Sequence, residues 1–336
     1  MSTDRNEWRP TANRTMLERR AKALACVREF FAVRGVMEVD TPMVVNAPVT
    51  DVHIHSAEVR FALNDTPTAP PNQAPYYLHT SPEFAMKRLL ASGSGDIYQT
   101  CHVVRALERG RQHNAEFTLI EWYRLDYSLE NLMEEVEALA RAVLGEVAPH
   151  WKSERVCYEE AIERALHLNP FTASLEDLRA AAREAGFDAS SESQDAAERD
   201  ELLELLMGTY VGPRLGREAL TFVHRYPASQ AALARLDPND SRCALRFELY
   251  CQGMELANGF HELAAATEQR ARFEQDLAER HRRGLVASGM DTRLLGALEH
   301  GFPDCAGVAV GFDRLLMLAT GVDHIDQVMP FPIERA

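Results

Sequence analysis

The chain has 336 residues, of which 46% are hydrophobic and 26% charged, and its formal net charge is −15. This is the composition of an ordinary globular protein, and the excess of acids argues against a broad, non-specific grip on nucleic acid, which depends on Lys and Arg meeting phosphates. No apolar run approaches the ~20 residues that span a bilayer, and residues 1–10 are polar with mixed charge, so we expect neither a membrane segment nor a signal peptide.

The cysteines and histidines form no metal-binding pattern. The six cysteines are scattered without a C-x-x-C pair, and the twelve histidines show no H-E-x-x-H or similar ligand spacing. We therefore expect no zinc site, and we expect free, buried thiols in a reducing cytoplasm.

The first third of the chain alternates between helical and extended patterns. Apolar residues recur every three or four positions over 15–33, which predicts an amphipathic helix, and a short strand ended by a proline follows over 36–42. Residues 64–75 predict a loop and 76–79 a strand. A helix then begins at Ser81-Pro82-Glu83, which offers a hydroxyl cap, a proline in the first turn and a carboxylate at the positive end of the helix dipole.

Two strands and a long helical block form the middle of the chain. Strands are predicted over 97–105 and 116–124, joined by a polar loop. Four predicted helices follow, near 128–144, 157–167, 174–185 and 195–210. We expect this block, roughly 128–212, to be an insertion between segments of one sheet.

The last third returns to strands. Predicted strands lie near 220–226, 243–251, 254–262 and 308–310, and predicted helices near 267–283, 291–300 and 312–319. Because the strands come mostly as adjacent antiparallel pairs, we expect the α+β class, with an antiparallel sheet flanked by helices in a single domain over 1–336. No Gly-rich loop of the P-loop or dinucleotide-binding type is present, so a nucleotide would have to be held in another way.

The strand over 116–124 places chemically active side chains on one face. Phe117, Glu121 and Tyr123 share odd parity, and alternate side chains of a strand point to the same face. Arg105 ends the preceding strand, so an aromatic ring, a cation, a carboxylate and a phenol could line one cleft. A solvated face with a few ion pairs explains the same pattern, and the residues alone leave both interpretations open.

The segments 243–251 and 254–262 predict a hairpin that turns at Gln252-Gly253. This register pairs Tyr250 with Glu255 and Glu248 with Ala257. Glu248 and Glu255 then become diagonal neighbours on one face, roughly 7–8 Å apart at the backbone. Magnesium, which is commonly held by one or two carboxylates plus substrate phosphates, would relieve their repulsion.

The return strand of this hairpin carries two further polar residues, Asn258 and Glu262. In the predicted register both have the wrong parity for the carboxylate face. A bulge near Ala257 would turn them onto that face, and bulges occur next to active sites. Surface acids on a solvated hairpin explain the same residues without a metal, and that alternative stays open.

A glycine-flanked strand precedes the last helix. Residues 307–311 read Gly-Val-Ala-Val-Gly and lead into a helix whose first turn holds Arg314. Small residues permit the close approach of a ligand. An arginine at a helix N-terminus opposes the local dipole, which favours a ligand-binding role over a structural one.

Three of these pieces resemble, in this order, the signature motifs of class II aminoacyl-tRNA synthetases. They lie at 17–42 (motif 1, the dimer element), 105–121 (motif 2) and 307–314 (motif 3). Residues 246–249 and 255–263 are similar to the lysyl-specific members of the class. The resemblance covers nearly the whole chain and implies the synthetase-like antiparallel sheet flanked by helices, and a homodimer.

Lysyl-tRNA synthetases carry an additional N-terminal anticodon-binding barrel, but motif 1 begins here near residue 17 and leaves no room for one. The chain resembles the paralogous branch that consists of a bare catalytic domain, most closely at 80–83, 121–123, 227–230 and 259–263. This resemblance implies a cytoplasmic, ATP-dependent amino-acid ligase that adenylates (R)-β-lysine and transfers it to a lysine ε-amine of elongation factor P. AMP and pyrophosphate would be released, magnesium would be required, and tRNA would not be stably bound.

The resemblance also implies an ATP site. Arg105 would contact the α-phosphate and Arg314 the γ-phosphate of a bent ATP, and these two arginines would be the catalytic residues. Phe117 and Arg314 would enclose the adenine, and Glu248 and Glu255 would hold magnesium. The remaining nucleotide-binding residues would be Glu108, His113, Asn114, Leu256 and Gly311.

The implied amino-acid pocket is rich in acids, because a desolvated dication needs negative partners. The residues around the substrate would be Ser81, Pro82, Glu83, Glu121, Tyr123, Asn258, Glu262 and Ala309. Ser81 and Ala309 stand where lysyl enzymes usually have alanine and glycine. One methylene is worth ~1–3 kcal/mol of discrimination, the size of effect that would select β- over α-lysine.

One departure from the lysyl enzymes lies in motif 2. Leu107 stands where those enzymes have a glutamate, and Glu108 is expected to replace it through a different loop path. Three alternatives stay open: a truncated lysyl-tRNA synthetase-like enzyme that activates α-lysine, a non-catalytic synthetase-like regulator, and an amide ligase acting on a small molecule. Leu107 favours the regulator, whereas the presence of both Arg105 and Arg314 favours an enzyme.

Overall fold

The computed structural model describes residues 8–61, 75–145, 151–188, 196–285 and 289–336. Its contacts divide the chain into two compact units. Unit 1 comprises Met1–Asp126, Leu139–Val147 and Ala264–Ala336, and unit 2 comprises Tyr127–Ala138 and Ala148–Leu263. Helix α3 (Leu129–Leu144) contributes residues to both units.

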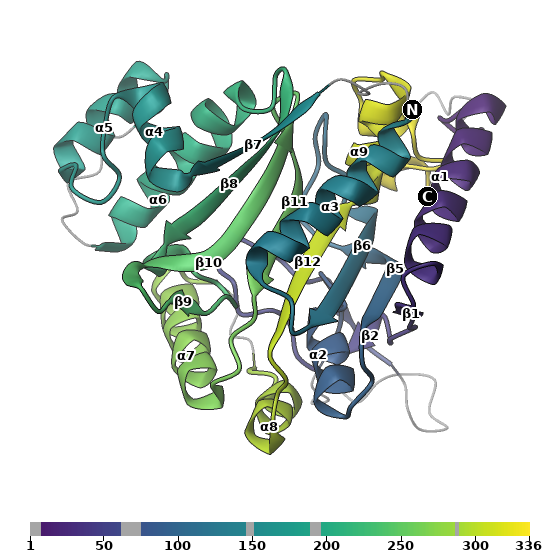
Figure 1. Cartoon of the computed structure of the whole chain (residues 1–336), viewed down its shortest axis with the longest axis horizontal. Helices are drawn as coiled ribbons and strands as arrows, with labels where there is room; N and C mark the ends of the chain where they lie inside the picture. Colours follow the sequence, from purple (N-terminus) through teal and green to yellow (C-terminus); the bar gives the residue numbers. More distant parts are fainter. Residues whose placement is uncertain (1–7, 62–74, 146–150, 189–195, 286–288) are drawn as a thin grey trace. The chain divides into compact units, whose positions relative to one another are not determined.

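Unit 1 contains two sets of strands (Figure 1). The larger set has the order β1 (Met37–Glu38), β5 (Ile97–Val104), β6 (Glu116–Leu125), β12 (Cys305–Gly311). The smaller set has the order β2 (Val44–Val45), β4 (Tyr76–Leu78), β3 (Glu58–Val59). β1 and β5 are parallel, and the other pairs in this unit are antiparallel.

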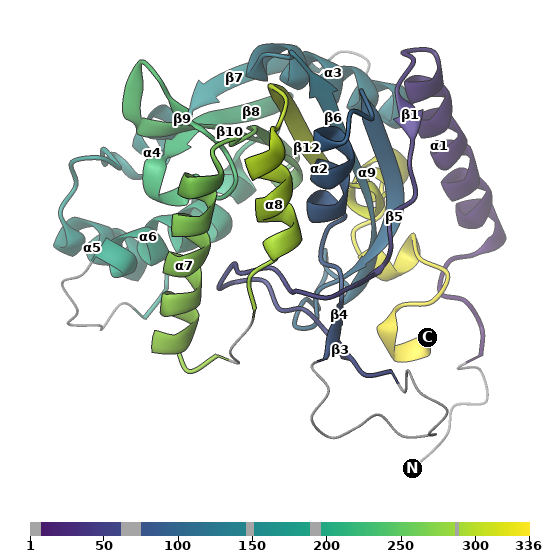
Figure 2. The ribbon, with the colours of Figure 1, turned by 90° about the horizontal axis from the view of Figure 1, so that it is seen from below.

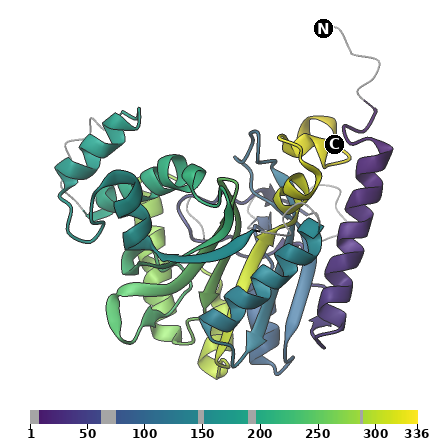
Figure 3. The same ribbon diagram turned by 45° about the horizontal axis from the view of Figure 1, so that its top comes forward.

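Helices cover both faces of the β5–β6 strand pair. Helix α1 (Arg14–Ala32) runs beside β5 (Figure 3), and the Phe31 ring stacks on Tyr98 with 4.2 Å between centroids. Helix α2 (Glu83–Ala91) packs its Met86 and Leu90 against Ile97 and Tyr123 on the opposite face. Buried apolar side chains on both faces therefore fix the strand pair that carries motif 2.

The remaining helices of unit 1 come from the C-terminal part of the chain. Helices α7 (Ala266–Arg282) and α8 (Thr292–His300) lie side by side with α2 (Figure 2). Helix α9 (Phe312–Thr320) follows β12 directly, and the short 3₁₀ turns η5 (Ile325–Gln327) and η6 (Ile333–Arg335) complete the unit. No helix within the described ranges combines the length and apolar character that a membrane crossing requires.

Unit 2 contains strands in the order β11 (Met254–His261), β10 (Asp240–Cys251), β8 (Ala219–Pro227), β7 (Lys152–Cys157), with β9 (Leu236–Asp237) paired to β10. Between β7 and β8 lie helices α4 (Tyr158–Leu166), α5 (Leu175–Glu184) and α6 (Ala196–Leu206), the π-helical turn η2 (Met207–Val211) and the 3₁₀ turn η3 (Gly212–Arg214). A further 3₁₀ turn, η4 (Ala228–Gln230), follows β8. β7 and β8 are parallel because a helical crossover joins them.

The predicted α+β class is confirmed, although two parallel pairs make the strand arrangement mixed rather than antiparallel throughout. Each long predicted helix and strand is present within a few residues of its predicted bounds. β7 was not predicted, because Lys152–Cys157 begins with four polar residues and gains its strand partner only through the fold. The predicted loop over 64–75 lies, except for Pro75, outside the described residues.

Candidate active site

The strand β6 presents the predicted face. In the register of β5 and β6, Val103 lies opposite Phe117 and Gln99 opposite Glu121. On the other side of β6, Ala309 of β12 lies opposite Glu121. The period-two prediction that Phe117, Glu121 and Tyr123 share a face is therefore confirmed, and Ala309 joins them.

Glu121 is the centre of a buried hydrogen-bond cluster. Glu121 is only 2% exposed. Ser81 Oγ donates to Glu121 Oε2 at 2.7 Å, and the Tyr123 hydroxyl donates to Glu121 Oε1 at 2.8 Å. The interpretation as a solvated face is wrong here, because a buried carboxylate held by two hydroxyl groups is oriented before any cation arrives.

Glu83, predicted to be one of the residues around the substrate, already has a cation beside it. Lys87, one turn further along α2, places Nζ 2.7 Å from Glu83 Oε1, and Lys87 is 1% exposed. The sequence analysis did not single out Lys87, since an i,i+4 pair of this kind is usually an exposed helix contact. The predicted hydroxyl cap at Ser81 is wrong, because Pro82 is the N-cap of α2, but Ser81 Oγ still accepts the backbone N–H of Glu83 at 3.0 Å.

A cavity of about 150 Å³ lies beside the start of α2 within unit 1. Ser81, Pro82 and Glu83 line it, together with His79 and the apolar segment over 42–49. The His79 ring is buried and its Nε2 contacts His102 O at 2.8 Å. Burial lowers the pKa of His79, so the ring is neutral at pH 7.

Arg105 lies over the motif 2 phenylalanine. Its guanidinium carbon is 5.1 Å from the centroid of the Phe117 ring. Arg105 Nε donates to Thr80 O at 3.4 Å, and Nη1 pairs with Glu108 Oε1 at 3.2 Å. Leu107 points away and is 73% exposed. The loop path thus brings Glu108 rather than Leu107 to the arginine, as expected from the altered motif.

Arg314 contacts the turn between β5 and β6. It lies in the first turn of α9, and its Nη2 donates to His113 Nε2 at 2.5 Å while Nε donates to Gln112 O at 3.3 Å. Burial lowers the pKa of His113, and the charges of Arg314 and Arg105 lower it further, against an opposing contribution from Glu108. Arg314 therefore contacts a neutral imidazole directly, and the charge of Arg105 acts on the same ring in the same direction.

An unpredicted buried network fixes the start of α9. Asp313 is 1% exposed, accepts the Thr118 backbone N–H at 2.6 Å and pairs with Arg20 Nη1 at 2.5 Å. Arg20 Nη2 also donates to Thr118 Oγ1 at 2.7 Å, which joins α1, β6 and α9. The single acid in the helix 312–320, Asp313, was the available signal for this network.

Asn114 and Gly311 are predicted to bind the nucleotide, and both also have contacts or neighbours within the protein. The buried Asn114 side chain donates to Glu116 O at 2.7 Å and accepts Ile333 N–H at 3.1 Å, so it ties the strand end to η6. A Cβ on Gly311 would lie 3.6 Å from the Arg314 side chain, an ordinary contact. The glycine therefore leaves room beside Arg314 without being demanded by backbone strain.

In unit 2, the predicted two-residue turn of the β10–β11 hairpin is confirmed. Cys251 pairs with Met254 and Tyr250 with Glu255. Gln252 and Gly253 have φ values of 51° and 75°, as the favoured two-residue hairpin turn requires. The predicted Glu248–Ala257 pair is wrong: a register shift between Leu249 and Tyr250 places Asn258 opposite Glu248.

The same shift turns the polar residues of β11 onto the carboxylate face, as a bulge near Ala257 was expected to do. Leu256 is the extra residue, and Phe260 lies opposite Arg246 two positions further on. Asn258 and Glu262 thereby gain the parity of Glu248. Asn258 Oδ1 is buried and makes no hydrogen bond within the described part of the chain, so it can accept one from a ligand.

Glu248 and Glu255 form the donor set predicted for magnesium. Glu248 is 7% exposed, and its two oxygens accept hydrogen bonds from Arg246 Nη2 at 2.5 Å and from the Tyr250 hydroxyl at 2.6 Å. The described residues hold no metal-binding group of three or more His, Cys, Asp or Glu side chains. Two carboxylates on one face fit a magnesium ion that takes its other ligands from phosphates and water.

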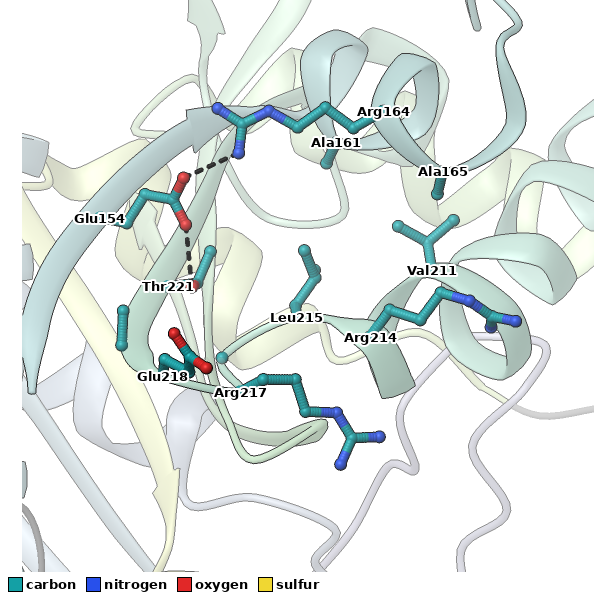
Figure 4. A pocket seen from close by; sticks show the side chains of 12 residues that line it. Glu154, Ala161, Arg164, Ala165, Val211, Arg214, Leu215, Arg217, Glu218 and Thr221 are labelled. Carbon is teal, nitrogen blue, oxygen red and sulfur yellow. Dashed lines mark hydrogen bonds and ion pairs between the residues drawn. The ribbon is translucent and has the colours of Figure 1, made fainter.

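A second cavity, of about 390 Å³, lies within unit 2 (Figure 4). None of the predicted site residues lines it. Its wall carries an ordinary surface ion pair between Arg164 and Glu154, at 2.7 Å, and Thr221 donates to the same glutamate at 3.3 Å. Size alone therefore does not identify the site; the converging polar groups do.

Comparison with known proteins identifies the family. The model of the family described as tRNA synthetases class II (D, K and N) matches residues 6–335. The chain belongs to the class II tRNA synthetases. The matched range includes the segments that resemble motif 2, in β5–β6 with Arg105, and motif 3, in β12–α9 with Arg314.

Curated relatives within the class II synthetases cover the chain almost end to end. A protein of Photobacterium profundum is 48% identical over 330 residues, which are 98% of this chain and 99% of that protein. Proteins of Vibrio parahaemolyticus and of Yersinia enterocolitica are 47% and 46% identical, with 98% of this chain and 98–99% of each relative covered. All three relatives bear the name elongation factor P–(R)-β-lysine ligase.

Proposed function

We propose that this protein is an ATP-dependent ligase that adenylates (R)-β-lysine and transfers it to a lysine ε-amine of elongation factor P. The relatives that carry this name match the chain over 98% of its length. The observation that carries the proposal is the placement of Arg105 over the Phe117 ring and of Arg314 against the turn between β5 and β6. Two cations beside an aromatic face suit a triphosphate attached to a purine.

In the first step a carboxylate oxygen of the amino acid attacks the α-phosphorus of ATP, and pyrophosphate leaves. Arg105 would neutralise charge that develops on the α-phosphate, and Arg314 would bind the γ-phosphate. The protein contributes position and charge rather than covalent chemistry, as in other phosphoryl-type transfers. In the second step the acceptor nitrogen attacks the carbonyl carbon of the acyl-adenylate, loses a proton, and AMP leaves.

The Glu121 cluster would bind one of the two ammonium groups of the substrate. A buried carboxylate that accepts from neutral hydroxyl donors such as Ser81 and Tyr123 keeps its negative charge available for a cation. In unit 2, Asn258 Oδ1 is a buried acceptor suited to an amine, and Glu262 follows β11 with the same parity. A diamino acid satisfies acidic groups that a neutral side chain would leave uncompensated.

Magnesium would be held by Glu248 and Glu255, and when bound it would neutralise charge on the phosphates. The role of the protein in this region is to hold the two carboxylates on one face of the hairpin. Arg246 lies 4.4 Å from the Tyr226 ring centroid and orients Glu248 through its ion pair. The turn at Gln252-Gly253 sets the register that brings Glu255 to the same face.

We also propose a homodimer that works in the cytoplasm. Val33 and Met37, in the segment that resembles the dimer motif, are 67% and 50% exposed, which leaves apolar surface for a second copy. All six cysteines are free thiols, as suits a reducing compartment, although only three of them are buried and the other three are half-buried. Sedimentation of the purified protein tests the dimer.

Intact-mass measurement of elongation factor P tests the proposed function. Purified elongation factor P would be incubated with this protein, ATP and either (R)-β-lysine or α-lysine. We expect the mass to rise by one lysyl unit, with β-lysine strongly preferred. No gain in mass would contradict the proposal, and charging of tRNA with α-lysine in its place would identify a truncated lysyl-tRNA synthetase.

A further inference from the structure

The turn between β5 and β6 holds Arg314 from outside its own helix. Gly110 and His113 close the turn through two backbone hydrogen bonds, at 3.0 and 3.3 Å. Gln112 O and His113 Nε2 both accept from the Arg314 guanidinium. The direction of the Arg314 side chain therefore depends on where this turn lies.

The same turn is fastened to residues 323–335, here called the C-terminal segment. Ile325 N–H donates to Arg111 O at 2.9 Å, and Ile333 N–H donates to Asn114 Oδ1 at 3.1 Å. These two bonds hold the turn at each of its sides. Side-chain ion pairs add to them at Arg109 and Arg111.

Arg109 makes the densest of these contacts. Its Nη1 and Nη2 donate to the two carboxylate oxygens of Asp326, both at 3.0 Å. Its Nε and Nη2 donate to the two oxygens of Glu334, at 2.5 and 2.9 Å. Nη1 also reaches His113 O at 3.4 Å. The planar Arg109 guanidinium thus forms hydrogen bonds to two carboxylates of the C-terminal segment and to His113, which contacts Arg314.

The neighbouring Arg111 provides a natural comparison. It also pairs with an acid of the C-terminal segment, Asp323, but these side chains are 66% and 72% exposed. Arg109, Asp326 and Glu334 are 34%, 23% and 56% exposed. A single exposed ion pair is screened by water and salt and contributes little, whereas bidentate contacts to two carboxylates restrict the guanidinium more strongly.

We propose that Arg109 is a positioning residue for ATP: clamped by Asp326 and Glu334, it holds the turn that keeps His113 against Arg314. This inference rests on the proposed function, which assigns Arg314 to the γ-phosphate. With the clamp in place, Arg314 is oriented before ATP binds. Without it, ATP binding has to order both the turn and the arginine, which weakens binding. The Glu121 cluster makes none of these contacts, so binding of the amino acid is unaffected.

The test is amino-acid-dependent pyrophosphate exchange by the full-length protein, with ATP and β-lysine varied separately. We expect Arg109→Gln to raise KM for ATP about tenfold, equivalent to ~1.4 kcal/mol, and to leave kcat and KM for β-lysine within about twofold. Arg111→Gln is the matched control and is expected to change KM for ATP less than about twofold. Arg109→Lys keeps the charge but loses the bidentate geometry, so an intermediate value is expected.

A double-mutant cycle separates positioning from general weakening. Asp326→Asn should raise KM for ATP as Arg109→Gln does, and the double variant should be little worse than either single variant, because both remove one interaction. Deletion of residues 334–336 removes Glu334 and leaves the Ile333–Asn114 bond. We expect KM for ATP to rise about threefold in this variant, less than in Arg109→Gln, because Asp326 remains.

Several results would overturn the proposal. They are equal effects of Arg109→Gln and Arg111→Gln, equal changes in KM for ATP and for β-lysine, or fully additive effects in the cycle. If Arg109→Gln does not fold, Arg109→Lys and Asp326→Asn take its place. Both should raise KM for ATP and leave KM for β-lysine unchanged, and the opposite result in both would overturn the proposal. Three further results separate the levels of the proposal. No exchange by the unaltered protein would refute the proposed function, and retained exchange by Arg314→Ala would refute only the assignment of Arg314 to the γ-phosphate. Loss of exchange in Arg314→Ala together with an unchanged KM for ATP in Arg109→Gln would refute the clamp alone.

Discussion

The Glu121 cluster is suited to binding a cation, whereas Arg105 and Arg314 are suited to binding an anion. The protein holds the two kinds of charge in different ways. Glu121 is buried on a strand and both of its oxygens already accept from hydroxyl groups. Arg105 and Arg314 lie at loop and helix ends, and their contacts include an aromatic ring, a neutral imidazole and backbone carbonyls. The Glu121 carboxylate is held in one position, whereas Arg105 and Arg314 contact groups that phosphate oxygens can replace.

The difference has a physical reason. A single ammonium group is small, and a rigid, desolvated carboxylate binds it with the least loss of entropy. A triphosphate is large, heavily charged and must leave as pyrophosphate, so side chains that exchange partners suit it better. The comparison predicts that changes at the arginines act on nucleotide chemistry, and changes around Glu121 act on the choice of amino acid.

The largest expected effect is at Arg314. Arg314→Ala removes a guanidinium from the nucleotide end, and we expect pyrophosphate exchange to fall by about 10²- to 10³-fold, as when other preorganised transition-state donors are removed. Arg314→Lys should recover part of the loss through its charge. Exchange near the original rate in the alanine variant, with the fold intact by circular dichroism, would refute the role of this residue.

The second effect is at Glu121. Glu121→Gln keeps the volume but removes the charge, and we expect KM for β-lysine to rise about 10- to 100-fold, the value of a hydrogen bond to a charged group. KM for ATP should change less than about threefold. Glu116→Gln, on the opposite face of the same strand with a side chain 42% exposed, is the control. A parallel rise in both KM values would mean that Glu121 is not specific to the amino acid.

The third effect concerns substrate choice. Ala309 lies directly across from Glu121, so Ala309→Gly removes a methyl group beside the carboxylate that would bind the substrate. We expect the ratio of kcat/KM for α-lysine to that for β-lysine to rise about tenfold, within the range for one methylene. Adding Ser81→Ala, which removes a donor to Glu121, should raise the ratio further. An unchanged ratio would move the specificity determinant elsewhere.

Much of the site follows from sequence because its geometry is local. The shared face of Phe117, Glu121 and Tyr123 requires only the alternation of a strand. The hairpin turn requires only two residues that tolerate positive φ. The bulge was anticipated, but its place at Leu256 was not, so the predicted partner of Glu248 was wrong by one residue.

Contacts between distant segments could not be read from the sequence in this way. Arg109 and Asp326 are 217 positions apart, and neither stands in a pattern that points to the other. The Asp313–Arg20 pair spans 293 positions. The Lys87–Glu83 pair is local, but its burial depends on the surrounding fold, and burial rather than spacing gives it importance.

The smallest effect is on stability as a function of pH. His113 has a pKa below its ordinary value of 6.5, first because it is buried and then because Arg314 and Arg105 lie near. As pH falls below 6.5 the unfolded chain binds a proton at this position before the folded chain does, so stability is lost on acidification. His79 and His224, whose pKa values burial also lowers, act in the same direction.

His113→Asn should therefore lessen, without abolishing, the fall in melting temperature between about pH 7.5 and 5.5, measured relative to each protein's value at about pH 8. An unchanged slope would mean that the pKa of His113 is the same in the folded and the unfolded chain, and would contradict the lowering by burial and by the two arginines.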